Sequence, residues 1–252
     1  MKSLYSIILI VLVAVNFQVA KAEDGYRLWL RYDLVADPGI LKSYNKLIKG
    51  WIVEGDSPVI QSAKKELDKG LEGLLGHKVQ SFTSPGGNGL VIAGTPSGSP
   101  VVASLKLNDK LAGLGQEGYL IINTKYRNKK VIVIASNGDA GVLYGVFNFL
   151  RLLQTNQPVK SLSITSAPKI KIRLLNHWDN LDRSVERGYA GLSLWNWETL
   201  PGKLDERYTD YARANASVGI NGTVLTNVNA NAGYLAASQA NIVQEQSVRL
   251  LS

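Results

Sequence analysis

The stretch that decides the fold is Lys169–Trp195, KIKIRLLNHWDNLDRSVERGYAGLSLW. Basic and apolar side chains alternate over residues 169–175, which is typical of a strand, and a polar and aromatic run, Asn176–Asn180, follows directly. Residues 205–218 then predict a helix, and residues 222–226 predict a second strand. Strand, loop, helix and strand in this order open a (β/α)8 TIM barrel, so we expect this part of the chain to begin a barrel that it does not complete.

The run Asn176–Asn180 is the candidate functional site. Residues at the carboxyl ends of the strands face the active site in a barrel of this kind. The ring of Trp178 can stack on the apolar face of a sugar, and the neighbouring Asn, His and Asp side chains can hydrogen-bond its hydroxyl groups. Alternatively, Trp178 is a core aromatic and the charged residues around it form a solvated loop. The spacing alone does not separate these two interpretations.

The chain before this stretch predicts a separate α+β domain. One helix begins at Ser57-Pro58, a capping serine followed by a proline, and a second helix begins at Asp139 as its capping residue. A basic tip joins two apolar strands into a hairpin. Strands covered by one helical layer make a small α+β sandwich. The expected strands are residues 26–34, 89–93, 118–124 and 131–135, and the expected helices span residues 57–76 and 139–153.

The N-terminus predicts a signal peptide. Lys2 precedes an apolar run, Ile7–Val15, and Ala20-Lys21-Ala22 is a small-x-small cleavage site. The run is shorter than the about 20 apolar residues that cross a bilayer, although an uncleaved anchor is the alternative. We therefore expect an exported protein, periplasmic or extracellular, with no membrane contact after cleavage. The expected domains are a signal peptide at residues 1–22, an α+β domain at 23–155, a linker at 156–168 and an incomplete catalytic barrel at 169–252.

Composition excludes several kinds of site. There is no cysteine, which excludes disulfides and a cysteine nucleophile, and His77 and His177 have no metal-ligand spacing, so we expect no metal and no cofactor. The motif G-x-G-x-x-G at Gly113–Gly118 precedes a strand, whereas a dinucleotide site follows one. The net charge of +8 is dispersed except at Lys125–Lys130, so we expect no nucleic-acid partner. A mild positive balance suits an acidic glycan.

Four segments resemble one known family. NHWDNLDRSVERGYAGLSLW (Asn176–Trp195) closely resembles the sequence that opens the barrel of the glycoside hydrolase family 67 α-glucuronidases, and this motif is long and specific. GVLYGVFNFLRLLQT (Gly141–Thr155) and LVIAGTP (Leu90–Pro96) resemble the N-terminal domain of that family, and NGTVLTNVNANA (Asn221–Ala232) resembles its second barrel strand. We therefore interpret the chain as an N-terminal fragment of such an enzyme.

The resemblance implies an activity and a partner. Members of the family remove α-1,2-linked glucuronic acid, usually 4-O-methylated, from xylo-oligosaccharides during xylan breakdown, and they use an inverting mechanism. The implied partner is a glucuronic-acid-decorated xylo-oligosaccharide, and the implied full-length form is a homodimer. Trp178 matches a family tryptophan that lines the glucuronic-acid pocket. The expected substrate-binding residues are Trp178, Asn176, His177, Asp179, Asn180, Asn227 and Asn229.

The resemblance also places the catalytic pair. An inverting glycosidase uses two carboxyl groups, one as general acid and one to activate a water. In the family these come from middle and later barrel strands, so we expect them beyond Ser252 and assign no catalytic residue here. The chain alone is then expected to be inactive. Two alternatives are a non-catalytic exported glycan-binding module and a hexosaminidase-like exo-glycosidase that shares the N-terminal domain.

Overall fold

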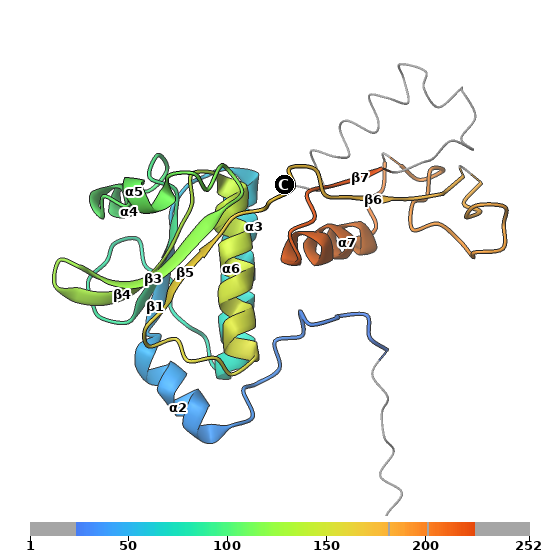
Figure 1. Ribbon diagram of the computed structural model, residues 1–252. Helices are drawn as coiled ribbons and strands as arrows, with labels where there is room; N and C mark the ends of the chain where they lie inside the picture. Colours follow the sequence, from blue (N-terminus) through green and yellow to red (C-terminus); the bar gives the residue numbers. More distant parts are fainter. Residues whose placement is uncertain (1–23, 181, 201, 225–252) are drawn as a thin grey trace, which may run out of the picture.

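The computed structural model describes residues 24–180, 182–200 and 202–224, which form two parts (Figure 1). The first part is a five-stranded sheet with helices, and the second is a two-stranded sheet with one helix. The expected signal peptide lies outside the described residues and stays a prediction. Within the described ranges, no helix has the length and apolar character needed to cross a membrane.

The first part contains a mixed sheet in the order β1-β2-β4-β3-β5. Strands β1, β2 and β4 run parallel, whereas β3 runs antiparallel to both β4 and β5. The elements are α2 (Pro38–Leu47), β1 (Gly50–Val53), α3 (Pro58–Leu75), β2 (Leu90–Gly94), α4 (Pro100–Ser104), α5 (Asn108–Leu111), β3 (Tyr119–Tyr126), β4 (Lys129–Ala135), α6 (Asp139–Gln154) and β5 (Ser163–Ser166).

Helices cover both faces of this sheet. On β4, Ile132 and Ile134 point into the core formed with α3 and α6, while Val131 and Val133 point into a second core formed with α4 and α5. The mixed α/β architecture is confirmed, but the expected single helical layer is wrong. Helices lie on both faces because β2 and the inner part of β4 are apolar at every position. Side chains on both faces of these strands must therefore be buried.

Local signals predicted several of these elements correctly. The hydroxyl of Ser57 accepts a hydrogen bond from the backbone N–H of Ile60 at the start of α3, and Gly76 ends the helix with a left-handed φ of 75°. The hairpin β3–β4 and the apolar stripe of α6 are also present. However, Gly138 is the N-cap of α6. Asp139 lies in the first turn, where its carboxylate accepts a hydrogen bond from the Ser57 hydroxyl at 2.6 Å.

Two predicted segments differ in the structure. Residues 26–31 form turns and residues 32–34 are irregular, so no strand is present. Leu28 and Tyr32 have positive φ values of 51° and 54°, which an extended strand does not allow. The expected linker at residues 156–168 contains β5, which pairs with β3 at the edge of the sheet. Helix α2 and strand β1 were not predicted.

The second part consists of β6 (Leu174–Asn176), α7 (Glu206–Ser217) and β7 (Gly222–Val224). The two strands are parallel, with Leu174 opposite Gly222 and Asn176 opposite Val224. The predicted order of strand, helix and parallel strand is therefore present, although β6 begins at Leu174 and not at residue 169. Closure into a (β/α)8 barrel is not seen within the described residues and stays a prediction.

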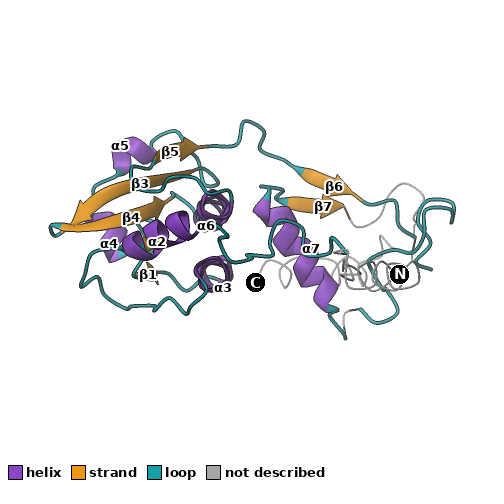
Figure 2. Cartoon of the chain, turned by 90° about the horizontal axis from the view of Figure 1, so that it is seen from below, coloured by secondary structure: helices purple, strands orange, loops and turns teal. Residues whose placement is uncertain are grey.

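Two ion pairs join the parts. Arg213 on α7 holds the buried carboxylate of Glu66 on α3 through two hydrogen bonds of 2.7 and 2.8 Å. Arg173, which directly precedes β6, binds Glu117 at 2.9 Å, and Asn221 binds the other oxygen of Glu117 at 2.8 Å. Figure 2 shows the two parts side by side, with α7 on the side that faces α3 and α6. These contacts fix the position of β6 and therefore of the candidate site that follows it.

Candidate functional site

The candidate site begins at the carboxyl end of β6. Asn176 is the last residue of the strand, and the backbone N–H of His177 donates to the carbonyl of Val224 at 2.9 Å, which continues the pairing with β7. The next side chains alternate in direction. Trp178 is 48% exposed, whereas Asp179 is 4% exposed. Strand geometry therefore places His177 and Asp179 inward and Asn176 and Trp178 outward. The Asn180 side chain is bonded within the loop that follows.

The inward set forms a chain of polar contacts. The Nε2 atom of His177 lies 2.6 Å from the hydroxyl of Tyr211 on α7, and its Nδ1 atom lies 3.5 Å from a carboxylate oxygen of Asp179. That oxygen also accepts a hydrogen bond from the Ser193 hydroxyl at 2.6 Å. The Tyr211 hydroxyl lies 3.1 Å from the hydroxyl of Thr223 on β7. His177 and Asp179 thus tie the end of β6 to α7 and β7.

An aromatic cluster lies under this chain. Trp195 and Tyr208 are each 1% exposed, and their ring centroids are 5.0 Å apart. The rings of His177 and Tyr211 meet Trp195 edge-on at 5.7 and 5.4 Å. Trp195, Tyr208 and Tyr211 were not among the predicted site residues. The spacing of the two tyrosines, three residues apart on a helix, was the available signal that they share one face.

The outward residue, Trp178, stands on a compact loop. Its carbonyl accepts a hydrogen bond from the backbone N–H of Glu186 at 2.6 Å. The Asn180 side chain donates to the hydroxyl of Ser184 at 3.0 Å and to the carbonyl of Glu186 at 2.8 Å, so it holds the loop. Glu186 has a positive φ of 59°, which lets the loop turn back on itself.

The structure therefore distributes the predicted residues as follows. Asn176 and Trp178 are exposed at the strand end, whereas His177, Asp179 and Asn180 are bonded within the protein. The alternative of Trp178 as a core aromatic does not match its exposure in the described structure. Asn227 and Asn229 lie outside the described residues. No group of three or more His, Cys, Asp or Glu side chains that could hold a metal occurs in the parts of the chain that the structure describes.

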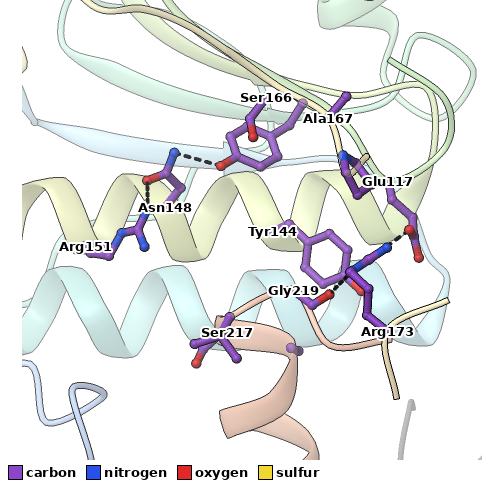
Figure 3. Close-up of a pocket in the computed structure, with 13 residues that line it drawn as sticks. Glu117, Tyr144, Asn148, Arg151, Ser166, Ala167, Arg173, Ser217 and Gly219 are labelled. Carbon is purple, nitrogen blue, oxygen red and sulfur yellow. Dashed lines mark hydrogen bonds and ion pairs between the residues drawn. The ribbon is translucent and has the colours of Figure 1, made fainter. Parts of the chain in front are cut away.

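A separate cavity of about 290 Å³ lies at the junction of the two parts, between α6, residues 166–168 and the end of α7 (Figure 3). Its polar groups are bonded to one another. Asn148 donates to the hydroxyl of Tyr119 at 2.8 Å and accepts from Arg151 at 3.1 Å, while Arg173 is paired with Glu117. The cavity does not include the end of β6, so we regard it as a polar seam between the two parts.

Comparison with known proteins identifies relatives along nearly the whole chain. The model of the glycosyl hydrolase family 67 N-terminus matches residues 28–149, and the model of the family 67 middle domain matches residues 152–249. A probable α-glucuronidase A from Aspergillus clavatus is 33% identical over 236 residues, which is 91% of this chain and 27% of that protein. An α-glucuronidase A from Emericella nidulans is 33% identical over 238 residues, 88% of this chain and 26% of that protein. The chain thus spans about a quarter of the length of these relatives.

Solved structures give weaker likenesses. A family GH115 4-O-methyl-α-glucuronidase with specificity for decorated arabinogalactans aligns with a TM-score of 0.49 and 15% identity, over 69% of this chain and 25% of that chain. A β-hexosaminidase from Streptomyces plicatus aligns with a TM-score of 0.41 and 14% identity, over 69% of this chain and 29% of that chain. Neither likeness carries an argument about function. The two family models match consecutive stretches in the expected order, and the chain belongs to glycosyl hydrolase family 67.

Proposed function

We propose that this chain is part of an α-glucuronidase that removes α-1,2-linked glucuronic acid, with or without a 4-O-methyl group, from xylo-oligosaccharides by an inverting mechanism. The observation that carries the proposal is family membership together with the exposed Trp178 at the carboxyl end of β6. Ligands of parallel α/β folds bind outside this end of the strands. The two-part order of sheet domain and first barrel unit supports a (β/α)8 barrel as the catalytic domain.

In this proposal Trp178 is the sugar platform. About half of its side chain is accessible, while the loop beneath it is held by hydrogen bonds from Glu186 and Asn180. A ring carried by a backbone that is already held loses less conformational entropy when a sugar stacks on it than a ring on an unsupported loop. Asn176, exposed at the same strand end, offers an amide to a sugar hydroxyl. Asn227 and Asn229 are proposed as further contacts from the next strand.

The local acids support a catalytic pair elsewhere in the barrel. A general acid needs a raised pKa, so that it carries a proton at working pH. The hydroxyl and backbone N–H of Ser184 bind Asp182 and lower its pKa, which favours the anion. Asp179 is bonded to Ser193 and lies under the loop. We propose that both carboxyl groups come from residues beyond Ser252. We also propose that the complete protein is exported, on the basis of the predicted signal peptide, and dimeric, on the basis of its resemblance to the family.

Release of glucuronic acid from aldouronic acids tests the proposal. We expect none from the 252-residue chain. We expect release from a longer polypeptide that joins this sequence to the remainder of a family 67 member. Turnover by the shorter chain in proportion to its concentration would contradict the placement of the carboxyl groups. Binding of the oligosaccharide without hydrolysis by the longer polypeptide would favour the alternative of a glycan-binding module.

A further inference from the structure

The loop that carries Trp178 exposes two more large side chains that the proposed function does not use. Tyr189 is 71% exposed, and Leu192 is 75% exposed. In Figure 1 this loop lies beyond β6, on the side away from the five-stranded sheet. Single exposed apolar residues are ordinary, whereas a group of them next to a ligand site indicates a wider binding surface.

Two bridges between extended segments of the loop fix the direction of Leu192. Asp179 lies opposite Val185, and Ser184 lies opposite Leu192, both in antiparallel register. Side chains alternate in direction along extended backbone, so the Ser184–Leu192 pair lies on the opposite face from the Asp179–Val185 pair. Asp179 is buried, and Leu192 therefore lies on the outward face together with Trp178.

Glu186 connects the two exposed aromatic residues. Its backbone N–H donates to the carbonyl of Trp178 at 2.6 Å. Its carboxylate accepts a hydrogen bond from the hydroxyl of Tyr189, and this bond raises the pKa of that tyrosine, which therefore keeps its proton. Gly188 and Gly191 have left-handed φ values of 90° and 87°, which let the chain fold back around Tyr189. Tyr189 is thus held beside the residue that contacts the backbone of Trp178.

The charges of the loop favour an uncharged ligand on Tyr189. Residues 182–192 contain two acids and two arginines and carry no net charge: Asp182, Glu186, Arg183 and Arg187. The carboxylate that accepts from the Tyr189 hydroxyl would repel a second carboxylate stacked on that ring. A xylose residue is neutral, and it has no hydroxymethyl group at C5, so its ring can stack closely on an aromatic face.

We propose that Tyr189 and Leu192 form the platform for the xylose residue to which the glucuronic acid is attached. This inference rests on the proposed function and adds an orientation for the substrate. Glu186 repels the carboxylate of the glucuronic acid on Trp178, so that sugar presents its glycosidic bond, and not its carboxylate, toward Glu186. The attached xylose then reaches Tyr189.

The test measures the binding of two ligands to the 252-residue chain by titration calorimetry. One is the methyl α-glycoside of glucuronic acid, and the other is glucuronic acid α-1,2-linked to xylose. Tyr189→Ala removes the ring, whereas Tyr189→Phe keeps the ring and removes the hydroxyl. Phe82→Ala is the control, because it removes an aromatic ring that is 38% exposed on the other part of the protein.

We expect the unchanged chain and the control to bind the xylose-linked ligand about fivefold more tightly than the methyl glycoside, since one exposed stacking contact lies at the low end of the range for base–aromatic stacking. Tyr189→Ala should abolish this difference and leave the affinity for the methyl glycoside unchanged. Tyr189→Phe should keep most of the difference, because the ring contacts the xylose. Trp178→Ala should weaken the binding of both ligands.

A full fivefold difference in Tyr189→Ala would overturn the inference and leave the proposed activity intact. An equal loss of affinity for both ligands in that variant would also overturn it, because Tyr189 would then support the loop as a whole. The inference also fails if the unchanged chain does not bind the xylose-linked ligand more tightly. Release of glucuronic acid by the longer polypeptide tests the activity separately. A difference that depends on Tyr189, without such release, would support this inference and refute the activity alone.

Discussion

The clamp between Glu66 and Arg213 gives the sharpest prediction about stability. Glu66 is only 6% exposed, and its carboxylate accepts two hydrogen bonds from Arg213 and one from the hydroxyl of Tyr32 at 2.6 Å. Burial raises the pKa of Tyr32, and the Glu66 charge raises it further, so this hydroxyl stays a donor. Burial works against the Arg213 cation, but the hydrogen bonds and charge of Glu66 raise its pKa. The change to make is Arg213→Met.

The expected cost follows from what the substitution leaves behind. Removing one partner of a buried ion pair typically costs about 3–5 kcal/mol, because the other charge stays buried without compensation. Here Tyr32 still donates to Glu66, and the Arg213 side chain is 18% exposed, so water reaches the site. We therefore expect a loss of about 2–3 kcal/mol in the free energy of unfolding, slightly below that range. For a protein of this size the melting temperature should fall by about 5–10 °C.

A second substitution distinguishes the charge from the packing. Glu66→Gln added to Arg213→Met removes the buried charge while the amide oxygen still accepts from Tyr32, so the double variant should regain most of the lost stability. Lys78→Met is the matched control at an exposed pair, since Lys78 binds Asp68 at 2.5 Å with its side chain 63% exposed, and it should leave the melting temperature unchanged. Urea and thermal unfolding measure all three. A double variant no more stable than Arg213→Met would refute the reasoning, because the loss would then come from packing.

Two further predictions follow from burial. Trp178→Ala in the longer polypeptide should lower kcat/KM about tenfold by analogy with base–aromatic stacking and cost little stability, whereas Trp195→Ala should cost about 3–5 kcal/mol of stability. Melting curves and steady-state kinetics on both variants check this, and equal stability losses would show that Trp178 is structural. Limited proteolysis of the 252-residue chain should leave a core that ends after Ser166, since β5 is part of the sheet. Cleavage between residues 155 and 162 that releases β5 would contradict this.

The elements predicted correctly are those that signals within a short stretch of sequence define. The cap at Ser57-Pro58 and the left-handed Gly76 act within one helix, and their helix was predicted correctly. Asp37 and Pro38 carry the same signal for α2, since the Asp37 carboxylate accepts from two backbone N–H groups, and it was overlooked. Strand β5 is short, polar and half buried, so only its pairing with β3 defines it. That pairing is non-local and leaves no periodicity in the sequence.

Residues 26–34 show how alternation can mislead. Their aromatic residues suggested a strand, but this segment packs along α7. The hydroxyl of Tyr26 donates to Asp210, and the indole N–H of Trp29 donates to Ser217. These partners lie more than 180 residues along the chain. Residues 26–34 carry apolar side chains because they fill the junction between the two parts of the protein. The periodicity rules for strands and helices do not detect a segment of this kind.

The sequence predicted that the candidate residues follow a strand, but it was not used to predict the directions of their side chains, and their role in binding a sugar stays a prediction. Residues 177–180 directly follow the strand that ends at Asn176, and the period of two along a strand also implies that His177 and Asp179 point opposite to Trp178. Treating all five residues as one sugar-facing set overlooked that implication.

The partners of the inward pair come from α7, β7 and the loop before α7, and these partners could be recognised only in three dimensions. Arg173 lies three positions before Asn176 and is held by Glu117 of the first part. The sheet domain therefore contacts the strand that presents Trp178 through Arg173, in addition to its contacts with Asn221 and Arg213. The orientation of the proposed sugar platform then depends on a domain that contributes none of the predicted sugar-binding residues.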